Sequence, residues 1–143
     1  MKALLDTSVL VAAFYGEHPR HGPSAALLAH QRPATGCTAA HCLAETYSVV
    51  TRMPGRLRAG PNHALQFIGS VRERLALVTL SDREYVDVLD QAVSAGVTGG
   101  AVYDAIIARC GQKARVLAIY TWNTRQFRLL GADVAARVRE PDA

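Results

Sequence analysis

The stretch ALLDTSVLV, residues 3–11, combines an expected strand, an acid and an expected helix, and it indicates the kind of fold that the chain adopts. Its first three residues are apolar and predict a short buried strand, and residues from about 7 to 15 then predict a helix. Asp6 lies at the junction, followed directly by the hydroxyls of Thr7 and Ser8. Asp is among the best residues for capping a helix N-terminus, so the position alone favours a cap. An acid inside a run that otherwise favours burial still makes Asp6 a candidate functional residue.

The composition is typical of one globular domain. The 143 residues are 50% hydrophobic and 20% charged, which permits a substantial core and lies outside the disordered range. No apolar run approaches the ~20 residues of a membrane span. The first apolar run is interrupted by Asp6, unlike that of a signal peptide. We therefore expect a single cytoplasmic domain, residues 1–143, with no membrane partner.

The three cysteines, Cys37, Cys42 and Cys110, are odd in number and lack paired spacing, which argues against a disulfide framework. A zinc site could be imagined from Cys37, His41 and Cys42. However, the chain has no Cys-x-x-Cys and no second ligand pair, so we favour three core cysteines.

The positive charge is concentrated in the middle of the chain. The net charge is +4, and Glu73 is the only acid between Thr46 and Leu80. The same segment contains Arg52, Arg56, Arg58, Arg72 and Arg74. Arginine can hold a phosphate through two donors at once. A solvated surface explains the patch equally well, so the patch permits a polyanionic partner without requiring one.

Short apolar segments alternate with helical patterns along the whole chain. We expect strands at residues 2–5, 33–38, 76–80 and 115–121, with a possible last strand at 132–138. We expect helices at residues 7–15, 24–31, 39–53, 62–75, 81–96, 101–113 and 124–131. Ser81 and Glu84 form a capping-box pattern, and Gly96 ends that helix. This alternation predicts an α/β fold in which helices flank a central parallel sheet of four to five strands.

Ligands bind such sheets beyond the carboxyl ends of the strands. Asp6 and Asn123 each follow an expected strand. Asp104 faces small or apolar neighbours on its helix, namely Gly100, Ala101, Ile107 and Ala108. A carboxylate there is costly unless a cation or hydrogen bonds compensate, so a metal-binding role gains weight, while burial with a backbone hydrogen bond stays open. Glu45 is a weaker candidate, because its helical face is mixed and typical of a solvated surface.

Four motifs, LLDTSVLVAAF, AAHCLAETYSVVTRMP, GGAVYDAIIARC and YTWNTRQF, occur in the order and spacing of the PIN-domain ribonucleases. The chain most resembles the VapC-type toxins of bacterial toxin–antitoxin pairs, over essentially its whole length. The resemblance implies a PIN-like fold in which Asp6, Glu45 and Asp104 converge to hold Mg²⁺ or Mn²⁺. It also implies that Thr7 or Ser8 supports that site. Asn123 stands where the acidic form of the pattern has an Asp, which weakens the case for a second tightly held metal.

The expected function is therefore a Mg²⁺-dependent endoribonuclease, the toxin half of a VapBC-type pair. Carboxylate-held divalent cations suit phosphodiester hydrolysis by an activated water. Arg52, Arg56 and Arg58 are the candidates for holding the RNA backbone. The resemblance further implies a homodimer and a VapB-type antitoxin. Two alternatives stay open: a PIN nuclease of RNA maturation or decay without an antitoxin, and a catalytically inactive RNA-binding PIN module.

Overall fold

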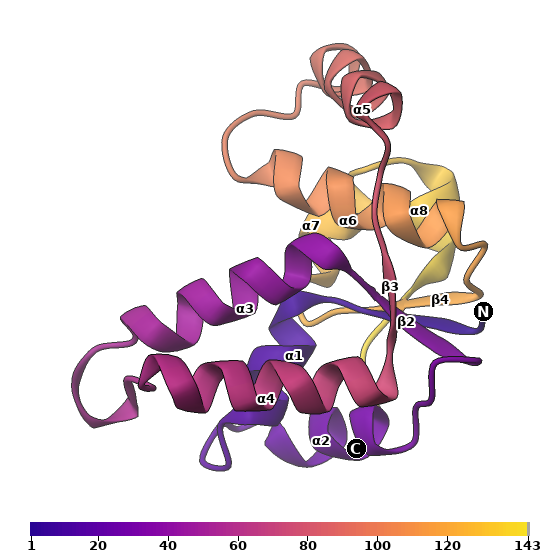
Figure 1. The fold of residues 1–143 in the computed structure, drawn as a ribbon. Helices are drawn as coiled ribbons and strands as arrows, with labels where there is room; N and C mark the ends of the chain where they lie inside the picture. Colours follow the sequence, from indigo (N-terminus) through magenta and orange to yellow (C-terminus); the bar gives the residue numbers. More distant parts are fainter. Residues whose placement is uncertain (143) are drawn as a thin grey trace.

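Five parallel strands form the central sheet, in the order β3-β2-β1-β4-β5 (Figure 1). The computed structural model describes residues 1–142. The strands are β1 (Ala3–Leu5), β2 (Gly36–Ala39), β3 (Ala76–Val78), β4 (Ala118–Tyr120) and β5 (Val138–Arg139). The prediction of a parallel sheet of four to five strands is confirmed, with five strands present.

The first strand lies in the middle of the sheet. Leu4 of β1 is opposite Cys37 of β2 on one side and Ile119 of β4 on the other. All three residues of β1 are buried. A strand covered on both faces needs a continuous apolar run, which is why the start of the sequence is apolar rather than alternating.

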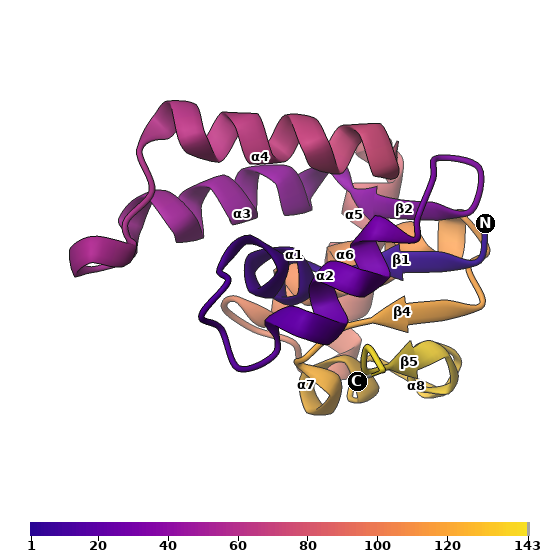
Figure 2. The same ribbon diagram turned by 90° about the horizontal axis from the view of Figure 1, so that it is seen from below.

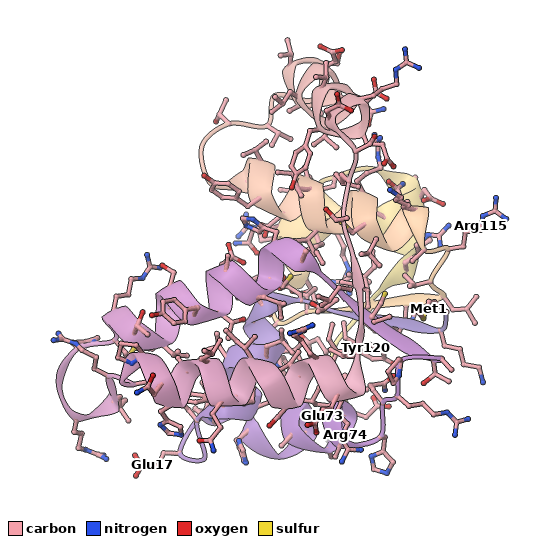
Figure 3. The ribbon with its side chains drawn as sticks, in the orientation of Figure 1. Met1, Glu17, Glu73, Arg74, Arg115 and Tyr120 are labelled. Atoms are coloured by element: carbon pink, nitrogen blue, oxygen red, sulfur yellow. The ribbon has the colours of Figure 1, made fainter. Side chains whose placement is uncertain are left out.

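The strand order reverses between β1 and β4. From β1 the chain builds outward to β2 and β3, and it then returns to place β4 on the other side of β1. Ligands of open parallel sheets bind beyond the carboxyl ends of the strands at such a switch point. In Figure 3, Met1 and Arg115, which precede β1 and β4, lie on one side of the molecule, and Glu17 lies on the opposite side. A site is therefore expected where β1 and β4 end.

Helices cover both faces of the sheet (Figures 1 and 2). They are α1 (Thr7–Phe14), α2 (His21–Ala29), α3 (Ala40–Arg52), the 3-10 helix η1 (Gly55–Leu57), α4 (Pro61–Arg74), α5 (Asp82–Ala95), α6 (Ala101–Lys113), α7 (Thr124–Arg128) and α8 (Ala132–Arg137). In both views α1 and α2 lie on one face and α6 on the other, while α3 and α4 lie side by side and extend past the strands. Within residues 1–142, no helix combines the length and the apolar character needed to cross a membrane.

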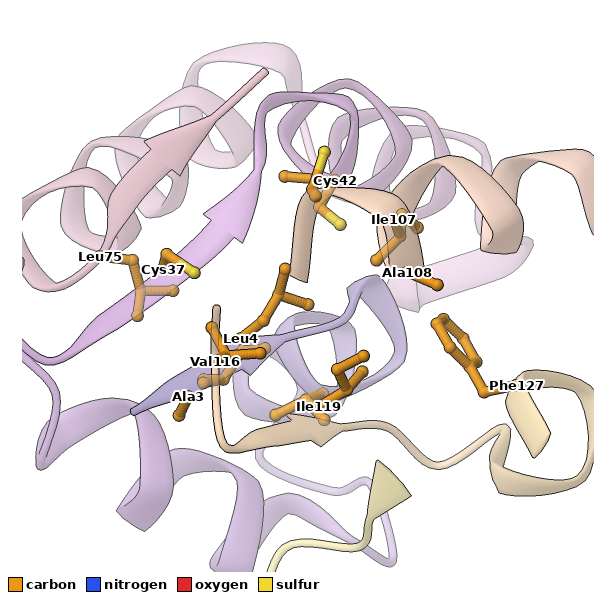
Figure 4. Close-up of a cluster of buried hydrophobic side chains, with 14 of the residues drawn as sticks. Ala3, Leu4, Cys37, Cys42, Leu75, Ile107, Ala108, Val116, Ile119 and Phe127 are labelled. Atoms are coloured by element: carbon orange, nitrogen blue, oxygen red, sulfur yellow. The ribbon is translucent and has the colours of Figure 1, made fainter. Parts of the chain in front are cut away.

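One continuous core joins the sheet to its helices (Figure 4). Leu4, Ile107, Ile119 and Phe127 are each 0% exposed, so β1, α6, β4 and α7 share this core. Gly111 lets α6 approach β4 closely, because a Cβ at this position would lie 3.1 Å from Cδ1 of Ile119. The cysteines Cys37, Cys42 and Cys110 are free and buried, as favoured from the sequence.

The end of the chain differs from the expectation. Residues 132–138 were expected to form a strand, but this is wrong for most of the segment, because Ala132–Arg137 is helix α8. Only Val138 and Arg139 form β5. Val134 and Val138 are the buried residues of this stretch, and they are four positions apart. That interval is helical, and the alanines between them favour a helix over a strand.

Candidate active site

A cleft of about 400 Å³ opens at the carboxyl ends of β1 and β4. Its walls come from α1, α3, α6, the connection between α1 and α2, and the residues after β4. Six of the lining residues are ones that the sequence singled out for the metal site and its support: Asp6, Thr7, Ser8, Glu45, Asp104 and Asn123. Segments more than a hundred residues apart therefore contribute to one surface.

Asp6 both caps helix α1 and faces the cleft. Its Oδ2 accepts hydrogen bonds from the Ser8 backbone N–H at 3.4 Å, Ser8 Oγ at 2.9 Å and Thr121 Oγ1 at 2.7 Å. The side chain is almost completely buried. Burial raises the pKa of Asp6 and the charge of Glu45 adds to this, whereas the hydrogen bonds from Thr121 and Ser8 oppose the rise. All three of these hydrogen bonds fall on Oδ2. Asp6 can therefore cap helix α1 and also act as a functional residue of the cleft.

Thr121 was not identified from the sequence. It follows β4 and is 0% exposed, and its Oγ1 donates to Asp6 Oδ2 while accepting from the Asn123 backbone N–H at 2.9 Å. This hydroxyl therefore connects the ends of β1 and β4 across the switch point. The available signal was a threonine at the end of a buried strand, inside the same YTWN motif from which only Asn123 was chosen.

Asp104 lies in the first turn of α6 and is partly buried. Burial, followed by the charges of Asp6 and Glu45, raises the pKa of Asp104 to about 7. The same two carboxylates are thus close enough to disfavour its ionisation. The structure thus places Asp6, Glu45 and Asp104 around one cleft. Their role as metal ligands stays a prediction.

Glu45 lies on α3, one helical turn after His41, a residue that contacts α6. Its Oε2 lies 3.6 Å from Nε2 of His41, one helical turn earlier, and its side chain is 30% exposed. The His41 ring stacks on Tyr103 of α6, with ring centroids 4.9 Å apart and planes inclined by 13°. Tyr103 immediately precedes Asp104, so this stack joins the two helices that present Glu45 and Asp104.

The donor set fits a hard divalent cation in its chemistry. The three acids and the Asn123 amide offer oxygen ligands, which Mg²⁺ and Mn²⁺ prefer. The buried Thr7 Oγ1 has no hydrogen-bond partner within residues 1–142. A cation would also relieve the repulsion by Asp6 and Glu45 that adds to the effect of burial in raising the pKa of Asp104. In the part of the chain that the structure describes, however, no three His, Cys, Asp or Glu side chains are already gathered closely enough to hold one ion.

The three arginines proposed to hold RNA lie at two different places on the surface. Arg52 lines the cleft, seven residues after Glu45 on α3. Arg56 and Arg58 do not flank the cleft as expected; they line a second hollow of about 300 Å³. Arg56 pairs with Glu17 at 3.0 Å (Glu17 is labelled in Figure 3), and Arg58 Nε donates to the Met53 carbonyl at 3.0 Å.

The chain turn after α3 explains this separation. Pro54 cannot continue the helix, and Gly55 adopts a left-handed φ of 67°. The two later arginines are therefore carried beyond the end of α3. The correction concerns their position, and it leaves Arg52 as the candidate nearest the acids.

The sequence also missed a basic and aromatic side of the cleft, formed by His18, Arg20 and Trp122. Proline and glycine surround His18 in the sequence, which is typical of a turn. This turn folds back against the cleft: the His18 backbone N–H donates to the Tyr15 carbonyl, and the ring of His21 contacts the Ala12 carbonyl at 3.0 Å. Local turn chemistry indicated a loop correctly but could not indicate which side of the molecule the loop covers.

Comparisons with known proteins agree with this architecture. The PIN domain family model matches residues 3–131. Ribonuclease VapC27 of Mycobacterium tuberculosis is 38% identical over 112 residues, covering 78% of this chain and 77% of the relative. Ribonuclease VapC40 of the same organism is 37% identical over 102 residues, covering 71% of this chain and 72% of the relative.

Two solved structures share the fold. The crystal structure of Mycobacterium tuberculosis VapC20, a Sarcin-Ricin loop cleaving toxin, superposes with a TM-score of 0.70 at 20% identity, over 85% of this chain and 90% of that one. The structure of PAE2754 from Pyrobaculum aerophilum gives a TM-score of 0.62 at 17% identity, over 96% of this chain and 83% of that one. At these identities the likeness concerns the fold alone.

Proposed function

The chain belongs to the PIN-domain family, among the VapC-type ribonucleases, and from this membership we propose that it is an endoribonuclease acting as the toxin of a VapBC-type pair. The observation that carries the proposal is the placement of Asp6, Glu45 and Asp104 around one cleft at the switch point of the sheet. The matched relatives are named ribonucleases, and the cleft contains the carboxylates that such chemistry requires.

Mg²⁺, or Mn²⁺ in its place, is the proposed cofactor, and Asp6, Glu45 and Asp104 would hold it. Bound there, the ion would supply an activated water and neutralise charge during phosphodiester hydrolysis. Ser8 and Thr121 fix the carboxylate of Asp6, so that it does not reorganise when substrate enters. Asn123 offers a neutral amide at the rim, suited to orienting a water or a phosphate oxygen without adding charge.

An RNA cleavage assay with added Mg²⁺, added Mn²⁺ or a chelator tests this proposal. Asp104→Asn keeps the shape of the side chain but removes its charge. We expect cleavage to fall by more than about 100-fold, the upper end of what loss of a supporting residue costs at a metal site. Asp87→Asn, an exposed acid on α5 outside the cleft, is the matched control. Equal activity of parent and Asp104→Asn would remove Asp104 from the site.

The antitoxin and the homodimer are part of the same proposal. Expression of the parent should arrest growth, and co-expression of a small DNA-binding protein encoded next to it should restore growth. Cleavage without any such rescue would favour a nuclease of RNA maturation or decay. RNA binding without cleavage, even with Mn²⁺, would favour an inactive RNA-binding module. Light scattering of the purified protein measures whether it is a dimer.

A further inference from the structure

Arg20 lies over the indole ring of Trp122 at the edge of the cleft that holds the three acids. Its Cζ is 4.6 Å from the centroid of the ring. Both residues line the cleft together with Asp6, Glu45 and Asp104. The cleft therefore has an acidic side and a side where a cation rests on an aromatic surface.

Trp122 is fixed at two points. Its backbone N–H donates to Ser8 Oγ at 2.9 Å, and its indole Nε1–H donates to Oγ of the fully buried Ser24 at 2.9 Å. The same Ser8 hydroxyl donates to Asp6 Oδ2. The backbone of Trp122 is thus connected to the carboxylate of Asp6 through one serine, and its ring is held separately by Ser24. These two attachments together set where the ring, and Arg20 over it, lie relative to Asp6.

The backbone that carries Arg20 is also held in place. The Arg20 N–H donates to Nδ1 of His18 at 3.0 Å, and the His21 N–H donates to the His18 carbonyl at 2.9 Å. The connection between α1 and α2 is therefore a structured turn. It delivers a cationic side chain from one wall of the cleft to an aromatic ring on another.

The guanidinium of Arg20 has no acidic partner in the part of the chain that the structure describes. The ion pairs there involve His41, Arg56, Lys113 and Arg137. Arg56 illustrates the contrast, since Glu17 occupies its guanidinium through two hydrogen bonds. A cation–π contact with an indole holds an arginine in place without using its N–H donors as hydrogen-bond donors. Those donors are the groups that bind a phosphate through two parallel hydrogen bonds.

We propose that Arg20, seated on Trp122, binds a phosphate of the RNA strand next to the acids; this inference rests on the proposed ribonuclease function. A cleft with three carboxylates repels a polyanion, and a cation in the same cleft offsets that repulsion. The ligand is a phosphate, because the N–H donors of a guanidinium held over the ring match the oxygens of a phosphate. Trp122 acts as a positioning residue, since it acts through Arg20.

The test compares three variants in the Asp104→Asn background, where binding can be measured without cleavage. Arg20→Gln removes the charge, Arg20→Lys keeps the charge without the paired donors, and Arg83→Gln removes an exposed charge on α5 outside the cleft. The probe is a labelled single-stranded RNA oligonucleotide of mixed sequence, titrated by fluorescence anisotropy at several salt concentrations. Thermal melting of each variant checks the fold.

We expect Arg20→Gln to weaken RNA binding about tenfold and to reduce the slope of log K against log salt by about 0.7, the value for one phosphate contact on a single strand. Arg20→Lys should keep the slope and recover only part of the affinity. Arg83→Gln should bind RNA as the Asp104→Asn protein without a further substitution does. In the cleaving parent background, Arg20→Gln should raise KM while changing kcat little. Trp122→Leu should reproduce the KM effect, and Trp122→Phe should restore most of the affinity.

Three outcomes would overturn the inference. The first is an Arg20→Gln slope equal to that of Arg83→Gln. The second is a loss of kcat with unchanged RNA affinity, which would place Arg20 in the chemical step. The third is normal RNA binding with reduced inhibition by the antitoxin, which would assign Arg20 to the protein partner. If the parent cleaves RNA and Arg20→Gln behaves as the control, only this inference fails; if the parent neither binds nor cleaves RNA, the proposed function fails first.

Discussion

Asp6 is the residue on which both the helix start and the cleft depend. Its Oδ2 receives the Ser8 and Thr121 hydroxyls, so one oxygen serves the fold while the carboxylate as a whole borders the cleft. Burial alone would make an ionised carboxylate here costly, and the two hydroxyls offset part of that cost. The hydroxyls of Ser8 and Thr121 are thus as important to the state of Asp6 as the neighbouring acids.

Replacing Thr121 with Val tests this support. The substitution removes the 2.7 Å hydrogen bond to Asp6 while keeping the size of the buried side chain. We expect the free energy of unfolding to fall by about 1–3 kcal/mol and cleavage to fall about 10- to 100-fold, because Asp6 is no longer fixed. Urea denaturation and the RNA assay measure the two effects. Thr79→Val, an exposed threonine after β3, is the control and should change neither quantity.

Asp104 should make the metal-free protein less stable as the pH rises. Its pKa is about 7 in the folded chain against an ordinary value of 3.8. Below 3.8 the group is protonated in both states; between about 4 and 7 the unfolded chain loses this proton before the folded chain does. The folded state then binds more protons, so the free energy of unfolding decreases with pH across this window.

Urea denaturation at pH 5 and pH 8 with a chelator measures this effect, and Asp104→Asn is the reference. We expect the parent to lose stability relative to the variant between these pH values, and added Mg²⁺ to restore it at pH 8. If parent and variant depend on pH in the same way, the carboxyl of Asp104 ionises as easily in the folded state as in the unfolded chain.

At the scale of elements, local signals in the sequence predict α5 well. Ser81 and Glu84 form the expected capping box, with bonds of 3.2 Å and 2.9 Å, and Gly96 ends the helix in a left-handed conformation. Glu84 also binds Lys113 at 2.7 Å, which ties the start of α5 to the end of α6. Neither Ser81 nor Glu84 lines the cleft.

Ser81→Ala should therefore separate stability from function. We expect a loss of about 1 kcal/mol in the free energy of unfolding, as for other N-cap substitutions, with no change in RNA cleavage. Ser94→Ala, at an exposed position in the last turn of the same helix, should leave stability almost unchanged. A reduced cleavage rate at a temperature where Ser81→Ala is fully folded would show that α5 affects the site.

Features that depend on neighbouring residues could be predicted from the sequence, whereas features that depend on distant contacts could not. Local patterns predict β1, β4 and the capped helix, and the resemblance to the PIN-domain ribonucleases implies the set Asp6, Glu45 and Asp104. Arg20 and Thr121 were missed because their roles depend on contacts with residues far away in the chain, on Trp122 and Asp6. No local pattern encodes such contacts. The last strand was misplaced because alanine-rich segments are compatible with more than one element until packing selects a helix.

At the scale of the whole molecule, the basic residues extend from the cleft along α3 and beyond it. Arg52 lies at the cleft, whereas Arg56 and Arg58 line the separate hollow past the end of α3. A short RNA would reach only the first of these residues. A longer RNA could also follow the surface towards the other two, where Glu17 competes for Arg56.

RNA length should therefore distinguish the three arginines. With an oligonucleotide of about six nucleotides, we expect Arg52→Gln to reduce the salt slope by about 0.7 and the double substitution Arg56→Gln, Arg58→Gln to have little effect. With a strand several times longer, the double variant should also reduce the slope. Salt titrations of both RNAs measure this. If the double variant has no effect on the longer strand, the end of α3 lies off the RNA path.

The position of β1 in the middle of the sheet has a consequence for biosynthesis. β4 can pair with β1 only after residues 118–120 have been translated, and Thr121 and Asn123 follow them. Until then the growing chain has Asp6 and Glu45 but lacks the strand that completes the cleft. Pairing over such long sequence separations is also slow compared with local folding. We therefore expect a nascent chain that has not reached Asn123 to be inactive, so that the ribosome producing this proposed nuclease is not exposed to its activity before that point of translation.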